Sequence, residues 1–567
     1  MSCMIIWPKT IDTPLKMNYT DYALPSGEKF SLCFDDKRVS RFPGLPLIDS
    51  VIRKTEVLVP FADALESFVS RKHCLYPTPH ILRQLVLSNL AGCRTFQDAK
   101  LMRRDPLAKT TLKGVASPAT LCRFFTALAE NCKLARSARL AELGVESVEE
   151  LNKRDPVRIR AQLTDVMNDL LLDNCLKLVK EKNPDQIIID VDSTPVALYG
   201  GQENVAFDGN YDENCYLPLF VVVNGVAAMV QNAPGATNGA ALLLLHIESL
   251  LDKVKKAFPK LPIIVRGDTG FGNQPLIEKI VSAECKYIIG CNNNGVVKAA
   301  QNAVLAQIHE EYSPAPGVST DIPAAVFEFF DLNFEALFLG QSKPEDRKFR
   351  LCGIVEGYKA GTWKTTRTVA YRIVYNPDFK GNKAFNFRFI QSNMTPDEVM
   401  ALTKGRGLEK GRSSPESSLM MDMKQARYAV ELYESAFSDR GMDERLNCEW
   451  KGDFFASCCS LSDFDANTIR MQLSVLSMQI GEKIRRIAFP KRPEPSGKKR
   501  RTNKPCKTRS HKAEPIWCGP LMRTIRKYLV CVPARLVQAK EAIRVCLPDI
   551  PKIFRNAFSQ LIAFSCN

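Results

Sequence analysis

Residues 437–451 carry charged side chains at a spacing that suits chemistry on phosphates. In a helix, with 100° per residue, four side chains would lie on one stripe within roughly 60° of arc: Phe437, Arg440, Glu444 and Lys451. One carboxylate would then lie between two cations. By itself such a stripe is more typical of a solvated, salt-bridged helix face. Its chemical meaning therefore depends on acidic residues elsewhere in the chain.

Two apolar runs upstream each end in aspartate. The run from residue 187 leads to Asp190 and Asp192, and the run from residue 262 ends in Asp268. Because strand side chains alternate, Asp190 and Asp192 share one face, where a carboxylate pair is costly unless a metal ion or cations neutralise it. Two strand aspartates and one helix glutamate are what a two-metal phosphoryl-transfer centre needs. The structural alternative is that Asp192 caps the next turn.

The elements that must position these residues predict an α/β core. Strand-like runs and helical patterns alternate here, with strands at 187–191, 217–225, 262–267 and 286–290, and helices at 240–258 and from 275 onward. Strand, loop and helix in that order put Asp268 at the carboxyl end of its strand, where open α/β sheets place their ligands. A long helix over 419–447 would carry Glu444, although Gly441 weakens that prediction by about 1 kcal/mol.

The N-terminal region is predicted to be helical from about residue 57 to 180 and to bind DNA. Its basic residues cluster, as the following set shows: Lys100, Arg103, Arg104, Lys109, Lys113 and Arg123. Ser117 would cap a helix that could be the recognition element of a helix-turn-helix variant. An ordinary helical bundle with a solvated basic rim accounts for these residues equally well.

The composition indicates a folded protein with an acidic polymer as partner. The 567 residues include 78 Lys and Arg against 62 Asp and Glu, a formal charge of +16, yet 45% are hydrophobic. The 19 cysteines form no CxxC, and the five histidines have no ligand spacing with them, so we expect reduced thiols and no structural zinc. Neither a secretory signal nor a run long enough to span a membrane is evident, which predicts a cytoplasmic protein.

Six regions are predicted along the chain. They are an N-terminal region with the helical DNA-binding domain (1–180), the first part of the core (181–295), a β-rich insertion (296–405), the second part of the core with the glutamate helix (406–489), a basic linker (490–519) and a helical, basic C-terminal tail (520–567).

Together these motifs resemble the DDE transposases of bacterial insertion sequences, in the group marked by a Tyr-x2-Arg-x3-Glu-x6-Lys signature. Arg440, Glu444 and Lys451 match that signature at its spacing, and Phe437 stands at its tyrosine position. The runs D-x-D-S-T-P at 190–195, R-G-D-T-G-F at 266–271 and R-G-M-D-E-R at 440–445 are most similar to the insertion sequence 1380 family. The resemblance runs from about residue 80 to the tail.

The resemblance implies a ribonuclease H-like fold and a Mg²⁺-dependent enzyme that cuts and joins DNA. Asp192, Asp268 and Glu444 would be the catalytic residues and would hold two Mg²⁺ ions, with Mn²⁺ as a substitute. Arg440 and Lys451 would bind DNA phosphates near the scissile bond. The implied partners are double-stranded DNA, as transposon ends and target, and a second copy of the chain in a synaptic homodimer. The implied location is the bacterial nucleoid.

Several alternatives stay open at this point. Asp190 competes with Asp192 as the first metal ligand. Arg440 and Lys451 could, instead of binding DNA, shift the pKa of Glu444 through salt bridges. Trp450 is a candidate for stacking on an unpaired base. Asp443 and Glu449 fall off the signature spacing and are expected to be surface charges.

Two other functions compete with transposition. One is a catalytically inactive, repurposed sequence-specific DNA-binding protein of the same fold, and the other is a nuclease that cuts without joining. The intact acidic triad favours an active transposase over the first of these.

Overall fold

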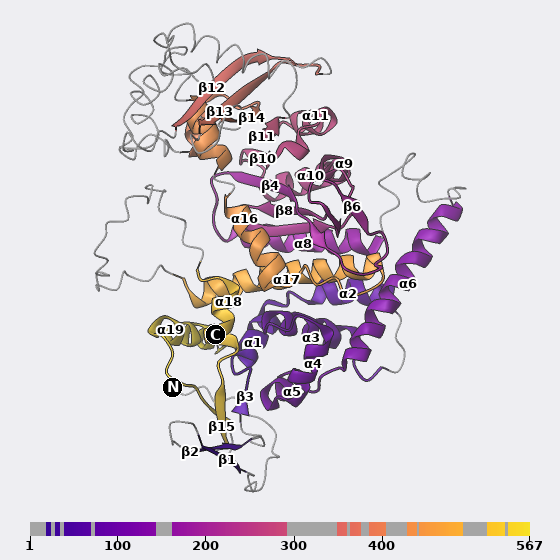
Figure 1. Cartoon of the computed structure of the whole chain (residues 1–567), viewed down its shortest axis with the longest axis vertical. Helices are drawn as coiled ribbons and strands as arrows, with labels where there is room; N and C mark the ends of the chain where they lie inside the picture. The colour runs from indigo at the N-terminus through magenta and orange to yellow at the C-terminus, as the bar shows by residue number, and fades with distance from the viewer. Residues whose placement is uncertain are drawn as a thin grey trace.

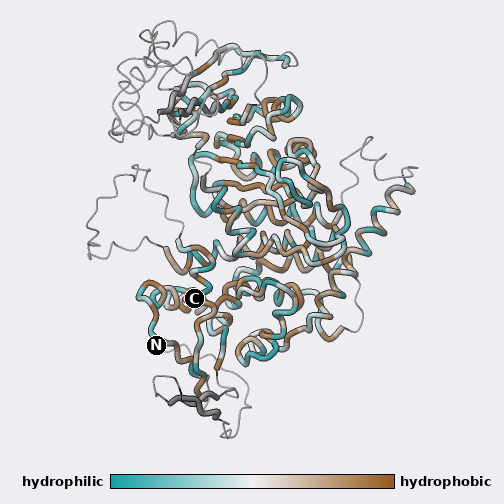
Figure 2. Tube along the Cα trace, viewed as in Figure 1, coloured by the Kyte–Doolittle hydropathy of each residue, from teal (hydrophilic) through white to brown (hydrophobic). Residues whose placement is uncertain are grey.

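The largest sheet that the structure describes has eight strands of mixed direction and lies in the upper half of the molecule in Figure 1. The computed structural model describes residues 19–23, 29–33, 39–69, 74–142, 162–291, 349–359, 363–375, 385–403, 428–438, 441–490, 519–538 and 543–566. The sheet has the order β12-β13-β14-β11-β10-β4-β8-β9. Its hydrophobic strands appear as brown segments in Figure 2. Much of the long helix α17 (Phe464–Ala488), which lies beneath the strands in this view, is also brown.

Five strands form the first part of the sheet; the sequence predicts four of them, and β9 was not predicted. They are β4 (Ile187–Ser193), β8 (Leu219–Val223), β9 (Val226–Gln231), β10 (Ile263–Gly267) and β11 (Lys286–Cys291). β4, β8 and β9 pair antiparallel, whereas β10 pairs parallel with both β4 and β11. Asn224 and Gly225 both have positive φ in the β8–β9 turn, a conformation typical of tight hairpins. This mixed sheet fits a ribonuclease H-like core.

The strands of the predicted β-rich insertion continue this same sheet. β12 (Phe349–Tyr358), β13 (Arg367–Tyr375) and β14 (Phe385–Ser392) pair antiparallel in sequence, and β14 pairs antiparallel with β11. The sequence shows the strand character of β12 and β13, but it indicates neither β14 as a strand nor the partners of the three, since β pairing is decided by contacts far along the chain. Residues 296–348 of the predicted insertion lie outside the described residues.

Helices cover the part of the sheet nearest the aspartates. α8 (Gln162–Lys180), α10 (Ile247–Ala257) and α11 (Gln274–Ser282) bury their apolar faces in one core with β4, β8 and β10. The helix predicted over 240–258 is two helices, α9 (Gly239–Leu244) and α10, because Leu245 and His246 form a turn in which each amide donates to the carbonyl three residues earlier.

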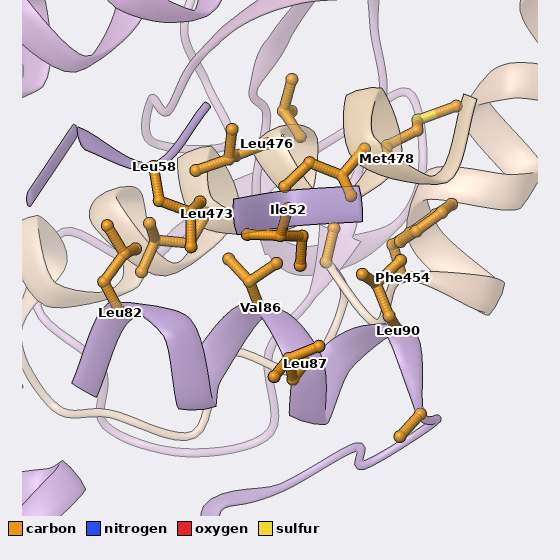
Figure 3. Close-up of a cluster of buried hydrophobic side chains, with 14 of the residues drawn as sticks. Ile52, Leu58, Leu82, Val86, Leu87, Leu90, Phe454, Leu473, Leu476 and Met478 are labelled. Atoms are coloured by element: carbon orange, nitrogen blue, oxygen red, sulfur yellow. The ribbon is translucent and has the colours of Figure 1, made fainter. Parts of the chain in front are cut away.

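A second core joins the sheet to both terminal regions through α17 (Phe464–Ala488). The helices that precede the sheet in the sequence contribute side chains to this second core. They are α1 (Leu45–Thr55), α2 (Val59–Phe68), α3 (Thr78–Leu90), α4 (Ala99–Arg104), α5 (Pro106–Leu112) and α6 (Pro118–Glu142). Figure 3 shows Val86, Leu87 and Leu90 of α3 beside Leu473 and Leu476 of α17. None of the described helices is long and apolar enough to cross a membrane.

The C-terminal tail is only partly helical, which corrects the prediction for 520–567. It contains α18 (Met522–Ile525), the π-helix η9 (Arg526–Val530), the hairpin β15 (Ala534–Gln538) and β16 (Ile543–Cys546), and α19 (Lys552–Cys566). β15 also pairs with β3 (Val39–Ser40), and α19 packs on α1 and α17. The tail therefore completes the fold of the N-terminal helices. Most of the predicted linker, 491–518, lies outside the described residues.

The segment around Glu444 is helical in two described pieces, and it extends beyond the predicted end at Asn447. Residues 428–438 include the π-helix η6 (Glu431–Phe437), and α16 (Gly441–Cys448) passes into the π-helix η8 (Glu449–Asp453). Residues 419–427 and 439–440 lie outside the described part.

Replacing Leu529 of the tail by Ala should destabilise the whole protein. The side chain is fully buried in the core that holds α1, α3 and α17, so its loss leaves a cavity that costs about 2 to 5 kcal/mol. Leu134→Ala, at an exposed position of α6, is the matched control and should shift the free energy of unfolding little. Urea unfolding of both variants measures the difference, and equal midpoints would show that the tail is not part of this core.

Candidate active site

Asp192 and Asp268 lie at neighbouring strand ends. β10 runs parallel to β4 with Gly267 opposite Val191, so the next residue of each strand continues side by side. Asp192 is half-buried and Asp268 is exposed. Asp268 also caps the short 3-10 helix η2 (Thr269–Phe271), because its Oδ1 accepts a hydrogen bond of 2.9 Å from the Gly270 amide. The order strand, loop and helix thus places this carboxylate where the sequence predicts.

Gly290 of β11 holds the Asp268 loop close to the sheet. A Cβ at this position would lie 2.4 Å from the Thr269 amide nitrogen and 2.7 Å from the Asp268 carbonyl carbon, both backbone atoms. Only glycine permits this approach. The position of Asp268 therefore depends on the next strand as well as on its own.

Asp190 lies on the same strand as Asp192 but has a structural partner. It is buried, and Arg266 of β10 forms two hydrogen bonds with it, from Nε to Oδ1 at 2.6 Å and from Nη2 to Oδ2 at 2.8 Å. The remaining Arg266 Nη1 donates to the Ala436 carbonyl at 2.7 Å. The cost of burying Asp190 is thus offset by a buried cation rather than by a metal ion.

The helix that carries Glu444 faces the end of β4. Asn447 Nδ2 donates to Asp192 Oδ2 at 2.6 Å, and Lys451 Nζ donates to Thr194 Oγ1 and to the Pro195 carbonyl. Thr194 and Pro195 directly follow β4. These contacts fix which face of α16 is turned toward the aspartates.

Glu444 lies one turn before Asn447 on this helix, and its side chain is exposed. Arg440, the other predicted phosphate-binding residue, lies outside the described residues. Within the part of the chain that the structure describes, no group of three or more His, Cys, Asp or Glu side chains is close enough together to hold a metal ion. The two aspartates and the glutamate helix are thus brought to one end of the sheet, but the three carboxylates do not share one coordination sphere.

The electrostatics of this end of the sheet are set by burial and by the aspartates. Burial lowers the pKa of Lys451, and the attraction of Asp192 counteracts this shift. Burial raises the pKa of Tyr211, and the nearby negative charges of Asp192 and Asp268 raise it further. Tyr211, in the turn between β6 (Ala206–Asp208) and β7 (Glu213–Tyr216), is a site neighbour that the sequence analysis missed, because no motif marks it.

Two expectations for residues near the signature are wrong. Trp450 is fully buried, stacks on Phe220 with ring centroids 4.8 Å apart, and donates from Nε1 to Ser474 Oγ at 2.8 Å, so no base can reach it. Glu449 is 1% exposed instead of a surface charge, and its Oε1 accepts from Arg485 Nη2 and the Met522 amide. Both side chains anchor the glutamate helix. The Asp443 side chain lies outside the description.

Comparison with known proteins identifies the class. The sequence matches the family model described as transposase DDE domain group 1 over residues 23–497, which is most of the chain. The protein therefore belongs to this family of DDE transposases. Among solved structures it is similar to a piggyBac transposase in a synaptic complex with hairpin DNA, with 10% identity, a TM-score of 0.35, and coverage of 76% of this chain and 73% of that one. The comparison with curated proteins finds no match.

The two aspartates of β4 should respond differently to neutralisation. Asp190→Asn leaves the buried guanidinium of Arg266 without its charge partner and should cost about 3 to 5 kcal/mol of stability. Asp192→Asn, at a half-exposed position, should change the free energy of unfolding by less than about 1 kcal/mol. Chemical unfolding without divalent cations measures the loss of stability in both variants. A larger loss for Asp192→Asn than for Asp190→Asn would make Asp192 the structural carboxylate and Asp190 the candidate metal ligand.

Proposed function

We propose that this protein is the transposase of a mobile DNA element, which binds the inverted repeats at the element's ends and carries out metal-dependent cleavage and strand transfer. The observation that carries the proposal is the arrangement at the carboxyl ends of β4 and β10. There Asp192 and Asp268 lie side by side, and α16 with Glu444 is fastened to the same edge by Asn447 and Lys451. Membership of the DDE transposase family supports this reading of the edge.

Asp192, Asp268 and Glu444 are the proposed ligands of two Mg²⁺ ions, which Mn²⁺ can replace. The donors fit in type, since hard divalent cations prefer carboxylate and carbonyl oxygens. They also fit in exposure, because Asp268 and Glu444 are exposed and Asp192 is half-exposed. When bound, the ions would activate the attacking oxygen and stabilise the leaving oxygen of the DNA phosphodiester. The protein's own task is to hold the three carboxylates and the DNA strand in line.

The first ligand in this proposal is Asp192 rather than Asp190. Both oxygens of Asp190 are used by Arg266 inside the protein. Asp192 instead lies at the strand end, next in register to Asp268. A metal ion at Asp190 would have to displace a buried guanidinium, which is costly.

The N-terminal helices provide the proposed DNA-binding surface. All six basic residues of the predicted cluster are exposed: Lys100, Arg103, Arg104, Lys109, Lys113 and Arg123. No salt bridge joins any of them to an acidic residue in the described part of the chain, whereas the cations around α17 are largely paired. Ser117 caps α6, as expected, by accepting from the Thr120 amide at 3.2 Å. Cations without acidic partners are free to neutralise phosphates.

Lys451 has a more local role than the grip on DNA that its place in the signature implies. Its ammonium group is half-buried and donates to Thr194 and Pro195, so it stabilises the turn after β4. It also contributes positive charge beside Asp192. We propose that it positions this carboxylate and adds to phosphate binding only at the edge of the site.

Finer assignments follow the sequence motifs. The likeness to the insertion sequence 1380 family supports a bacterial element, and pairing of two DNA ends supports a homodimer in the working complex. A repurposed DNA-binding protein would keep the basic helices but would have no use for carboxylates at the ends of both β4 and β10. That pair favours an active enzyme.

Single substitutions of the triad test the catalytic assignment. Asp192→Ala, Asp268→Ala and Glu444→Ala should each lower Mg²⁺-dependent cleavage of the element's end by at least about 1,000-fold, because each removes a ligand of the phosphoryl-transfer centre. Binding to the same DNA, measured by fluorescence anisotropy, should stay within about threefold of the wild type. The substrate is a labelled duplex that spans the junction of the element and its flank, as identified from inverted repeats beside the gene.

Cleavage, DNA binding and joining, measured on the same proteins, decide between the competing functions. Cleavage that survives in Asp192→Ala would reassign the first ligand. Wild-type binding without any cleavage in Mg²⁺ or Mn²⁺ would favour the repurposed binding protein. Cleavage without joining of the labelled end to target DNA would identify a nuclease.

Neutralising the basic cluster should weaken DNA binding in a salt-dependent way. Each cation that contacts a phosphate contributes about 0.9 to the slope of log K against log salt on duplex DNA. The triple change Lys100→Ala, Arg103→Ala and Arg104→Ala should therefore reduce the slope by about 2 to 3. Lys279→Ala, which removes an exposed cation paired with Glu248 on the sheet side, is the control. Identical slopes for all three proteins would place the DNA elsewhere.

A further inference from the structure

Asn447 makes a contact that no motif predicts. It is 6% exposed, and its Nδ2 donates to Asp192 Oδ2 at 2.6 Å. The orientation of the carboxamide follows from chemistry, because an ionised carboxylate can only accept hydrogen bonds. The nitrogen must therefore face Asp192. The oxygen then belongs to the same small planar group, beside that carboxylate.

The carboxamide oxygen of Asn447 is buried and has no hydrogen-bond partner in the described part of the protein. Leaving a buried acceptor unpaired costs about 1 to 3 kcal/mol, so buried polar atoms of this kind need an explanation. A leucine of similar size would avoid the cost if Asn447 served only to fill space. The oxygen is therefore available to a ligand that binds beside Asp192.

The position of Asn447 narrows the chemistry of that ligand. The residue lies between Glu444 and Lys451 on the helix face that meets the end of β4. A neutral carbonyl oxygen next to carboxylates is a donor type that Mg²⁺ and Mn²⁺ accept, either directly or through a bound water. A hydrogen-bond donor from DNA is a poorer match, since acidic groups dominate this edge and repel phosphates.

We propose that Asn447 has two functions at the site: its amide N–H orients Asp192, and its carboxamide oxygen acts as a neutral donor toward the divalent cation that Asp192 holds. This inference rests on the proposed function, because it needs a cation at Asp192. It adds a fourth residue to the predicted triad, and it makes Asn447 a positioning residue and a ligand of the metal centre. It also explains why the orphan oxygen is tolerated in the free protein.

Mn²⁺ binding to the full chain without DNA tests the inference. Titration calorimetry and the electron paramagnetic resonance signal of free Mn²⁺ both report affinity without any need for cleavage. Asn447→Leu keeps the size but removes both polar atoms, and it should weaken Mn²⁺ binding about 10-fold or more, as loss of a supporting group does at other metal sites. Its stability without metal should stay close to that of the wild type, because removal of the unpaired oxygen offsets the loss of the hydrogen bond to Asp192.

Asn447→Asp should have the opposite effects. A carboxylate next to Asp192 adds like-charge repulsion, so the metal-free protein should unfold at lower urea concentration at pH 8. The same added charge should tighten Mn²⁺ binding. Asn174→Leu is the matched control, since it makes the same chemical change on α8, where the side chain contacts Gln479, away from the site.

The outcomes separate this inference from the proposed function. If the wild type binds Mn²⁺, Asp192→Asn abolishes that binding, and Asn447→Leu binds as the wild type does, the role of Asn447 is refuted while the metal site stands. If the wild type does not bind, or Asp192→Asn binds equally well, the metal site at Asp192 is refuted and the Asn447 role with it. Opposite shifts for Leu and Asp, with Asn174→Leu unchanged, support the inference.

Discussion

The structure depends on the burial of α17 between the sheet and the terminal helices. A helix that is covered on nearly all sides must satisfy its polar side chains internally. Gln479 does so by donating to the carbonyls of Leu171 and Ala227, and the Gln472 side-chain nitrogen donates to the Thr164 carbonyl. These bonds fix both the axial position and the rotation of α17 against α8 and β9. The N-terminal helices and the tail then pack against a helix whose position is already determined by the core.

This central helix also determines where the glutamate helix lies. Ser474 accepts from the Trp450 indole, which stacks on Phe220 of β8, and Arg485 pairs with the buried Glu449. Both anchors lie just after α16, so they hold its C-terminal end against the sheet. Asn447 and Lys451 can then reach the end of β4. Trp450 contacts Ser474 of α17 and Phe220 of β8, and Phe220 lies opposite Asp192 in the sheet, so this route joins elements that are far apart in the sequence.

Local patterns in the sequence predicted β4 and β10, the two strands that lead to the aspartates, because both are short apolar runs bounded by turn residues. They did not predict pairing or burial partners. Strand character in 349–392 gave no sign that β14 would pair with β11, and the spacing that suggested a surface charge at Glu449 could not reveal Arg485, 36 positions later. Asp190 and Asp192 looked equivalent for the same reason, since only the fold brings Arg266 to one of them. Tyr211 and Asn447 lack a motif and become visible through their contacts alone.

Charge is divided within the molecule in a way that follows from the proposed chemistry. The chain carries a large positive surplus, yet Asp192 and Asp268 place two carboxylates at neighbouring strand ends, where they would repel a phosphodiester. Under the proposed function, the exposed cations of the N-terminal helices would hold the DNA without help from the carboxylates. The DNA backbone would then approach the carboxylates favourably only once divalent cations had reversed the local charge. Under the proposed function, binding and cleavage are thus separable, and the cation requirement protects bound DNA until the site is loaded.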